Sequence, residues 1–198
     1  MKRLILGAAM VLIGASLVPA RAEGNVNFNV GQRYMSDSLW DDYNLDTQDS
    51  FGVNVDLGED GSSFHAAFAL NTSGVFEWEN DNEETAIGEL SAGFLWVPKI
   101  KGRLQPFLGA GVSRVGATLD INGDDSDSVF GFYANGGLFW RVTQRFNMGF
   151  DVRTLQGAKL EFDAAELGVL ANAPRNRFEI DANHVQIGFL VGFNFGGR

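Results

Sequence analysis

The feature that most constrains the fold of this chain is a period-two alternation of apolar residues, which recurs in eight separate stretches. Successive side chains of a β-strand point to opposite faces, so an apolar residue at every second position is typical of a strand rather than of a helix. The clearest stretch is the last, with Val185, Ile187, Phe189, Val191, Phe193 and Phe195 on one face. The other seven apolar faces are Val26/Phe28/Val30, Phe51/Val53/Val55/Leu57, Phe64/Ala66/Phe68/Leu70, Leu90/Ala92/Phe94/Trp96, Leu108/Ala110/Val112, Phe130/Phe132/Ala134/Leu138/Trp140 and Phe146/Met148/Phe150/Val152. The chain is therefore predicted to be all-β.

The composition of the opposite face indicates which side points outward. A soluble barrel such as a lipocalin turns its apolar face inward and exposes a face rich in charged and hydroxyl side chains. Here the second face instead carries a few isolated charges and many glycines, namely Gly31, Gly52, Gly93, Gly131, Gly137, Gly149, Gly188 and Gly192. Small residues mixed with occasional large ones suit a narrow, filled lumen. We therefore predict that the apolar face contacts lipid.

The connections between the stretches alternate in length and so predict an orientation. Long connections are expected at 35–49, 72–85, 116–128 and 155–182, and short ones at 59–62, 98–104 and 143–145. Short periplasmic turns and long outer loops are typical of outer-membrane barrels. The prediction is an eight-stranded antiparallel up-and-down transmembrane β-barrel with both termini in the periplasm. An aromatic girdle is expected at the periplasmic interface, formed by Trp96, Trp140, Phe146, Phe193 and Phe195.

Residues 1–22 are predicted to be a secretory signal peptide, which leaves 23–198 as the barrel domain. Lys2 and Arg3 precede an apolar run, and residues 20–22 have an Ala-x-Ala arrangement. The alternative is an uncleaved helical anchor, for which the apolar run is short. Beyond this segment, 25 acidic and 12 basic residues give a net charge of −13.

Composition excludes several classes of function. The chain contains no cysteine, which removes disulfides, thiolate metal sites and cysteine nucleophiles. A net charge of −10 argues against a nucleic-acid partner, because phosphate binding needs clustered cations. A mean hydropathy of −0.05 excludes a polytopic helical membrane protein.

Isolated charges on the second face are predicted to meet inside the lumen. These are Glu89, Arg141, Asp151 and Arg153, which would have to pair because buried charges require partners. Four further arginines are expected near the outer strand ends and the last long loop, where they would contact lipid phosphates. They are Arg33, Arg114, Arg175 and Arg177.

Nineteen of the 25 acidic residues lie in the four long connections, whereas the cations Lys99, Lys101, Arg103 and Arg145 lie in the short turns. The acids are Asp37, Asp41, Asp42, Asp46, Asp49, Glu77, Glu79, Asp81, Glu83, Glu84, Asp120, Asp124, Asp125, Asp127, Glu161, Asp163, Glu166, Glu179 and Asp181. The first interpretation is a solvated outer rim. The alternative is a divalent-cation site, for which the best local candidate is Asp120, Asn122, Asp124 and Asp127; it lacks the later glutamate of an EF-hand loop. The segment 162–173 has helical spacing and is predicted to form a short helix over the barrel mouth.

Enzymatic chemistry would require a nucleophile with an activating base. The two histidines are the candidate bases: His184 lies three residues after Asp181, and His65 follows Ser62 and Ser63. Neither has the local pattern of a lipid-modifying site, so the chain is predicted to be no enzyme and to bind no cofactor.

The eight alternating segments, the run LQPFLGAGVSRVGA from Leu104 to Ala117 and the final VQIGFLVGFNF resemble the small outer-membrane β-barrel family of OmpA, OmpX and opacity-type proteins. The resemblance covers residues 23–198. It implies outer-membrane lipid, lipopolysaccharide and the barrel assembly machinery as partners, and leaves the oligomeric state open. The predicted function is a non-enzymatic envelope scaffold whose acidic loops serve adhesion or surface interaction. The alternatives are a narrow channel or transporter for small or apolar solutes and a lipid-modifying enzyme.

Overall fold

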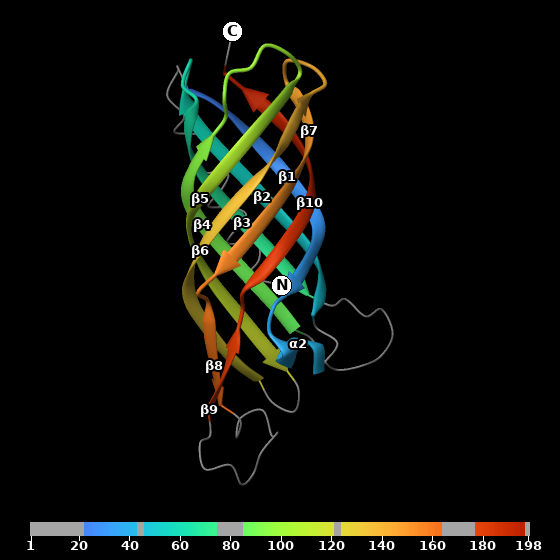
Figure 1. Ribbon diagram of the computed structural model, residues 1–198, viewed down its shortest axis with the longest axis vertical. Coiled ribbons are helices and arrows are strands. Elements are labelled where there is room, and N and C mark those ends of the chain that lie inside the picture. Colours follow the sequence, from blue (N-terminus) through green and yellow to red (C-terminus); the bar gives the residue numbers. More distant parts are fainter. Residues whose placement is uncertain (1–21, 43–45, 75–84, 121–123, 164–176, 197–198) are drawn as a thin grey trace.

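The structure is a computed structural model, and it describes residues 22–42, 46–74, 85–120, 124–163 and 177–196. Eight strands form a closed antiparallel barrel (Figure 1). They are β1 (Ala22–Met35), β2 (Thr47–Glu59), β3 (Phe64–Gly74), β4 (Thr85–Trp96), β5 (Leu104–Asp120), β6 (Asp124–Arg141), β7 (Phe146–Gln156) and β10 (His184–Phe195). The barrel closes where β1 pairs with β10, with Val30 opposite Phe189. The predicted eight-stranded up-and-down barrel is confirmed. The predicted signal peptide lies outside the described residues, except for Ala22, which begins β1.

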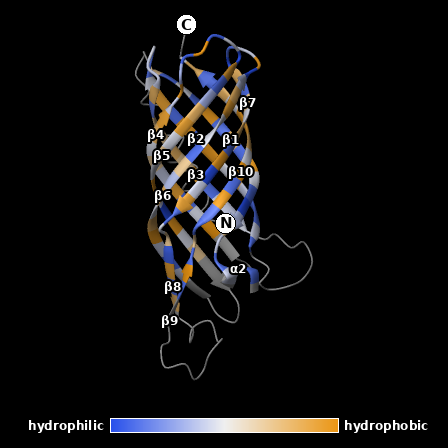
Figure 2. Cartoon of the chain, in the orientation of Figure 1, coloured by the Kyte–Doolittle hydropathy of each residue, from blue (hydrophilic) through white to orange (hydrophobic). Residues whose placement is uncertain are grey.

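The apolar faces of the strands point outward, as predicted. Phe94 and Phe132 are 72% and 71% exposed, and large apolar side chains on all eight strands are exposed or half-buried. The strands accordingly alternate between hydrophobic and hydrophilic residues along their lengths (Figure 2). The inward positions are buried and include many amides, hydroxyls and charges. The barrel is therefore apolar outside and polar in much of its interior.

The two ends of the barrel differ, and we name them by their connections. At the short-turn end, residues 60–63, 97–103 and 142–145 join successive strands. The tight β2–β3 turn uses Gly61 with a φ of +87°, a conformation that side chains other than glycine rarely adopt. The predicted girdle lies at this end: Trp96, Trp140 and Phe193 are exposed, and Phe146 packs edge-on against Phe193 with ring centroids 5.9 Å apart.

The long-loop end carries additional elements that the sequence did not reveal. A short helix, α2 (Ser38–Asp42), follows β1, and a two-stranded sheet of β8 (Lys159–Asp163) and β9 (Arg177–Asp181) extends beyond the barrel (Figure 1). The expected helix over 162–173 is wrong at its start, because residues 162 and 163 belong to β8; residues 164–176 lie outside the described part. No helix among the described residues has the length and apolarity needed to cross a membrane.

The expected long connection at 116–128 is also wrong in its bounds. β5 continues to Asp120 and β6 begins at Asp124, and the two strands pair along this whole length. Both strands therefore extend past their apolar stretches, where alternation no longer marks them. The other long connections begin and end close to the predicted residues.

Candidate functional site

A compact group of buried charges crosses the lumen in the half nearer the long loops. Glu89 of β4 accepts one contact from Arg33 of β1, with Oε2 3.0 Å from Nη2, and another from Arg153 of β7, with Oε1 2.6 Å from Nη2. The side chains of Arg33 and Glu89 are fully buried, and that of Arg153 is 4% exposed. We call these three residues the lumen charge cluster. One carboxylate thus ties together strands from three parts of the barrel wall.

Neighbouring polar groups add further contacts to this cluster. The hydroxyl of Ser113 donates to Glu89 Oε1 at 2.9 Å, and the amide oxygen of Gln186 accepts from Arg33 at 3.1 Å. The ring of Tyr133 lies 3.8 Å from the guanidinium carbon of Arg153, which is a cation–π arrangement. Tyr133 fits there because Gly93 opposite has no side chain: a Cβ on Gly93 would lie 2.6 Å from the tyrosine oxygen. The glycines of the inner face therefore make room for the large groups that fill the lumen.

Of the four charges predicted to meet in the lumen, the structure brings together Glu89 and Arg153. Asp151 is buried nearby and accepts from the amide of Asn135 at 3.1 Å. Arg141 is placed differently: it ends β6 at the short-turn end, where it is exposed and outside the cluster. The prediction had assigned it to the inner face without considering how far along the barrel that strand end lies.

The prediction for Arg33 is wrong. Its side chain is fully buried in the lumen and does not reach a lipid-facing surface. The reason is strand phase, since Phe28 and Val30 point outward and a residue at an odd distance from them points inward. Arg114 does point outward, and it donates to Ser128 Oγ at 2.9 Å. The side chains of Arg175 and Arg177 are outside the described part of the structure.

Apolar clusters lie at two other levels of the lumen. Toward the long loops, an outer apolar cluster packs Trp40 of α2 against strand residues and the β8–β9 sheet; its buried members are Met35, Trp40, Ile87, Val115, Ala117, Tyr133, Leu155, Ala158, Leu160, Phe162, Ile180 and Ala182. Toward the short turns, an inner apolar cluster contains Leu95, Val97, Phe107, Phe139 and Leu190, with the two phenylalanine rings stacked at 4.4 Å. A cavity of only about 40 Å³ is lined by residues of this inner cluster together with Asp151 and Arg153. Side chains therefore fill the lumen at three levels.

Both histidines are held in buried polar contacts. His184 is fully buried, with Nδ1 3.0 Å from the Ala182 carbonyl oxygen and Nε2 3.5 Å from Glu89 Oε2, so it borders the lumen charge cluster. His65 contacts Asp56 through Nδ1, and its Nε2 lies 3.9 Å from Glu23 Oε1. The described contacts of both rings are to carbonyl or carboxylate oxygens rather than to a serine hydroxyl.

The candidate cation ligands are only partly described. The backbones of Asp120 and Asp124 face each other in the β5–β6 register, whereas Asn122 is outside the described residues. Asp127 uses Oδ2 to accept from the backbone nitrogen of Glu161 at 2.8 Å, which attaches β8 to β6. Within the described ranges, no group of three acidic or histidine side chains is placed to hold a metal ion.

The acids of the long-loop end include structural as well as solvated members. Asp37 Oδ2 accepts from the backbone nitrogen of Asp181 at 2.8 Å, which joins the first loop to β9. Asp41, Asp49, Glu161 and Glu179 are exposed. The acids at 77–84 and Glu166 belong to segments outside the described residues.

Solved structures with a similar fold are outer-membrane proteins. OprG from Pseudomonas aeruginosa superposes with a TM-score of 0.58 at 11% identity, covering 88% of this chain and 95% of that one. Ail, the attachment invasion locus protein of Yersinia pestis, superposes with a TM-score of 0.57 at 10% identity, covering 88% of this chain and 99% of that one. Neisserial surface protein A superposes with a TM-score of 0.54 at 13% identity, covering 89% of this chain and 98% of that one. The likeness confirms the fold that the sequence resemblance implied. No family model matches the sequence, and no curated protein matches it.

Proposed function

We propose that the chain is a non-enzymatic protein of a bacterial outer membrane, in which the barrel is a closed scaffold that displays acidic loops at the cell surface. The short-turn end, with both ends of the barrel domain, faces the periplasm. The exposed apolar wall, the aromatic girdle and the similar solved structures support this location.

The observation that carries the proposal is the filled lumen. The lumen charge cluster is buried between an outer and an inner apolar cluster. An eight-stranded barrel has an interior only wide enough for side chains or one small ligand. The filled lumen therefore leaves no continuous water-filled pore through the barrel, and the protein acts through its exposed loops.

Conductance in planar bilayers tests the closed scaffold. We expect the purified barrel to show no steady single-channel openings, because ions would have to displace the pairing of Glu89 with Arg33 and Arg153. The matched control is a triple variant, Phe107→Ala, Phe139→Ala and Glu89→Ala, which removes side chains that fill the lumen. Steady openings of the unmodified protein, lost when the lumen is made bulkier, would show a channel instead.

Adhesion through the loops needs a separate test, which is binding of whole cells displaying the protein to host-cell or matrix surfaces. The acidic rim favours a cationic partner, so the binding is expected to weaken as ionic strength rises. Binding that is independent of salt, and equal in cells lacking the protein, would contradict this role.

Transport of small apolar solutes is a second candidate, because of one feature of the wall. β6 pairs with β7 only up to the pair Phe132 and Gln156, although β6 continues to Asp124. Beside this point lies the outer apolar cluster, whose members carry no charge. Uptake of a small alkane into vesicles containing the protein, compared with vesicles without it, would distinguish transport from a closed scaffold.

A further inference from the structure

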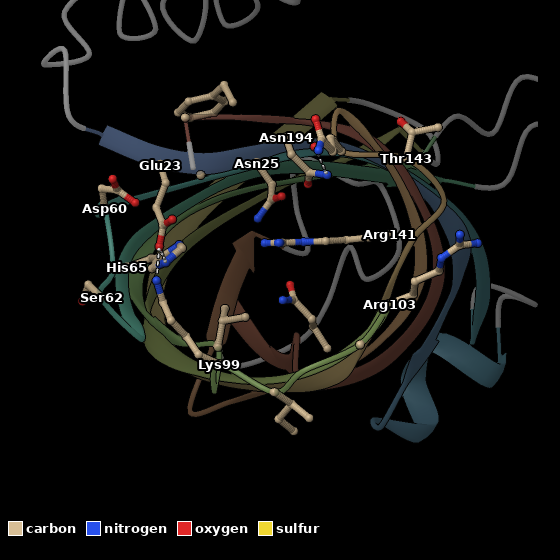
Figure 3. A pocket seen from close by; sticks show the side chains of 18 of the residues that line it. Glu23, Asn25, Asp60, Ser62, His65, Lys99, Arg103, Arg141, Thr143 and Asn194 are labelled. Carbon is tan, nitrogen blue, oxygen red and sulfur yellow. Dashed lines mark hydrogen bonds and ion pairs between the residues drawn. The ribbon is translucent and has the colours of Figure 1, made fainter. Parts of the chain in front are cut away.

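The short-turn end contains a vestibule of about 920 Å³ that the proposed scaffold role does not use (Figure 3). Its walls come from the beginning of β1, the three short turns and the end of β10. Ligand pockets in proteins commonly have volumes of about 300–1,000 Å³. The vestibule is thus large enough for a small molecule or a short peptide.

The floor of the vestibule is closed. Asn25 donates to both carboxylate oxygens of Asp56, at 3.1 and 2.9 Å, and Asn147 donates to the amide oxygen of Asn194 at 2.7 Å. Beneath this polar layer lies the inner apolar cluster with its stacked phenylalanine rings. A molecule that enters is therefore held at the mouth and not passed through the lumen.

One wall of the vestibule is internally neutralised. Lys99 Nζ lies 3.0 Å from Glu23 Oε1, and the same carboxylate lies near the ring of His65 (Figure 3). The ring of His65 in turn contacts Asp56. These groups alternate in charge along the wall. They satisfy one another and leave little net attraction for an ion.

The opposite wall carries an uncompensated cation. Arg141 extends into the opening (Figure 3), is exposed, and has no ion-pair partner among the residues that the structure describes. Lys101 and Arg103 also line the vestibule, so its described lining holds four Lys and Arg residues and two acids, Glu23 and Asp60. This positive end belongs to a chain whose net charge is −10. An anion is repelled by the acidic loops and attracted by the cations of this vestibule.

We propose that the vestibule binds an oxyanion ligand of small-molecule or short-peptide size, with Arg141 as its principal contact. The planar guanidinium presents two parallel N–H donors that match a carboxylate or a phosphate. Neighbouring cations add a non-directional attraction, and the hydrogen-bonded floor holds the site open. A guanidinium recognises carboxylates and phosphates in the same way, so the experiment compares these two types of anion directly.

Isothermal titration calorimetry tests the proposal on the full barrel in zwitterionic detergent at low ionic strength. Triglutamate is the carboxylate probe and inorganic pyrophosphate the phosphate probe. Arg141→Ala removes the proposed contact. Arg145→Ala is the matched control, because Arg145 is an exposed arginine of the same turn that does not line the vestibule.

We expect saturable binding of at least one probe. Its dissociation constant should rise at least tenfold in Arg141→Ala and stay within twofold of the unmodified protein in Arg145→Ala. The tighter probe identifies the source of the oxyanion. No saturable binding, or the same loss in both variants, overturns the proposal. If Arg141→Ala does not fold, the test is made by NMR on the unmodified protein. Chemical-shift changes of amide resonances confined to residues 23–25 and 141–144 on adding a probe support the site. Changes elsewhere contradict it.

Discussion

At the scale of single residues, the stability of the lumen depends on one carboxylate that serves two arginines. Glu89→Gln leaves Arg33 and Arg153 buried without the carboxylate that both contact, and breaking a buried pair on one side commonly costs about 3–5 kcal/mol. We expect a loss of that size in the free energy of unfolding, measured by urea titration of the barrel in lipid vesicles. Glu59→Gln, at an exposed position at the end of β2, is the control and is expected to change nothing. Equal unfolding midpoints for the two variants would show that the cluster adds no stability.

The residues of this cluster show how far a sequence can be interpreted. Strand phase was sufficient to place Glu89 and Arg153 inside, and the same phase would have placed Arg33 inside had it been extended from Phe28 and Val30. Which inward charges actually meet was not predictable, because Arg33 and Glu89 are 56 residues apart and touch across the lumen rather than between paired strands. Their contact depends on the register and closure of the whole barrel, which alternation does not specify.

At the scale of elements, the strands inside the apolar band were predictable and those beyond it were not. Lipid on one side and a packed lumen on the other force the alternation that identifies β3 or β10. Past the band, the apolar alternation is too short to identify a strand: β8 and β9 have five residues each, and their apolar positions are recognised only from the outer apolar cluster, in which Leu160, Phe162 and Ile180 are buried. The helix expected over 162–173 is wrong at residues 162 and 163, because a few apolar residues in a short strand also fit helical spacing.

The β8–β9 sheet has only two strands and needs packing from outside to be stable. Trp40 supplies it: the side chain is 1% exposed, and its indole nitrogen donates to the Asp181 carbonyl oxygen at 2.9 Å. Trp40→Ala is expected to speed amide hydrogen exchange at Leu160 and Ile180 by at least about tenfold, because loss of a buried tryptophan costs about 3–5 kcal/mol and this sheet opens locally.

Exchange in β3 and β4 is the internal reference for that experiment and is expected to stay unchanged. Tyr34→Phe is the matched variant, since Tyr34 is an exposed aromatic residue of the preceding strand. Uniformly faster exchange across the barrel would mean that Trp40 supports global rather than local stability.

At the scale of the whole molecule, the decisive property is which medium surrounds the wall. Every barrel strand pairs on both sides, so the closed barrel has no edge strand, and its stability depends on the match between the wall and its surroundings. A wall with Phe68 49% exposed and Phe94 72% exposed is costly in water and favourable in hydrocarbon.

Two arginine substitutions on one strand measure this directly. Phe68 lies in the middle of β3 on its outward face, and Thr72 lies on the same face four residues nearer the long loops. An arginine on the lipid face costs about 2–4 kcal/mol at the bilayer midplane and about 0–1 kcal/mol near an interface. Phe68→Arg is therefore expected to lower the free energy of unfolding in vesicles by the larger amount and Thr72→Arg by the smaller. If water wetted this wall, Phe68→Arg would be the milder change of the two, because it would replace an exposed apolar ring with a solvated charge.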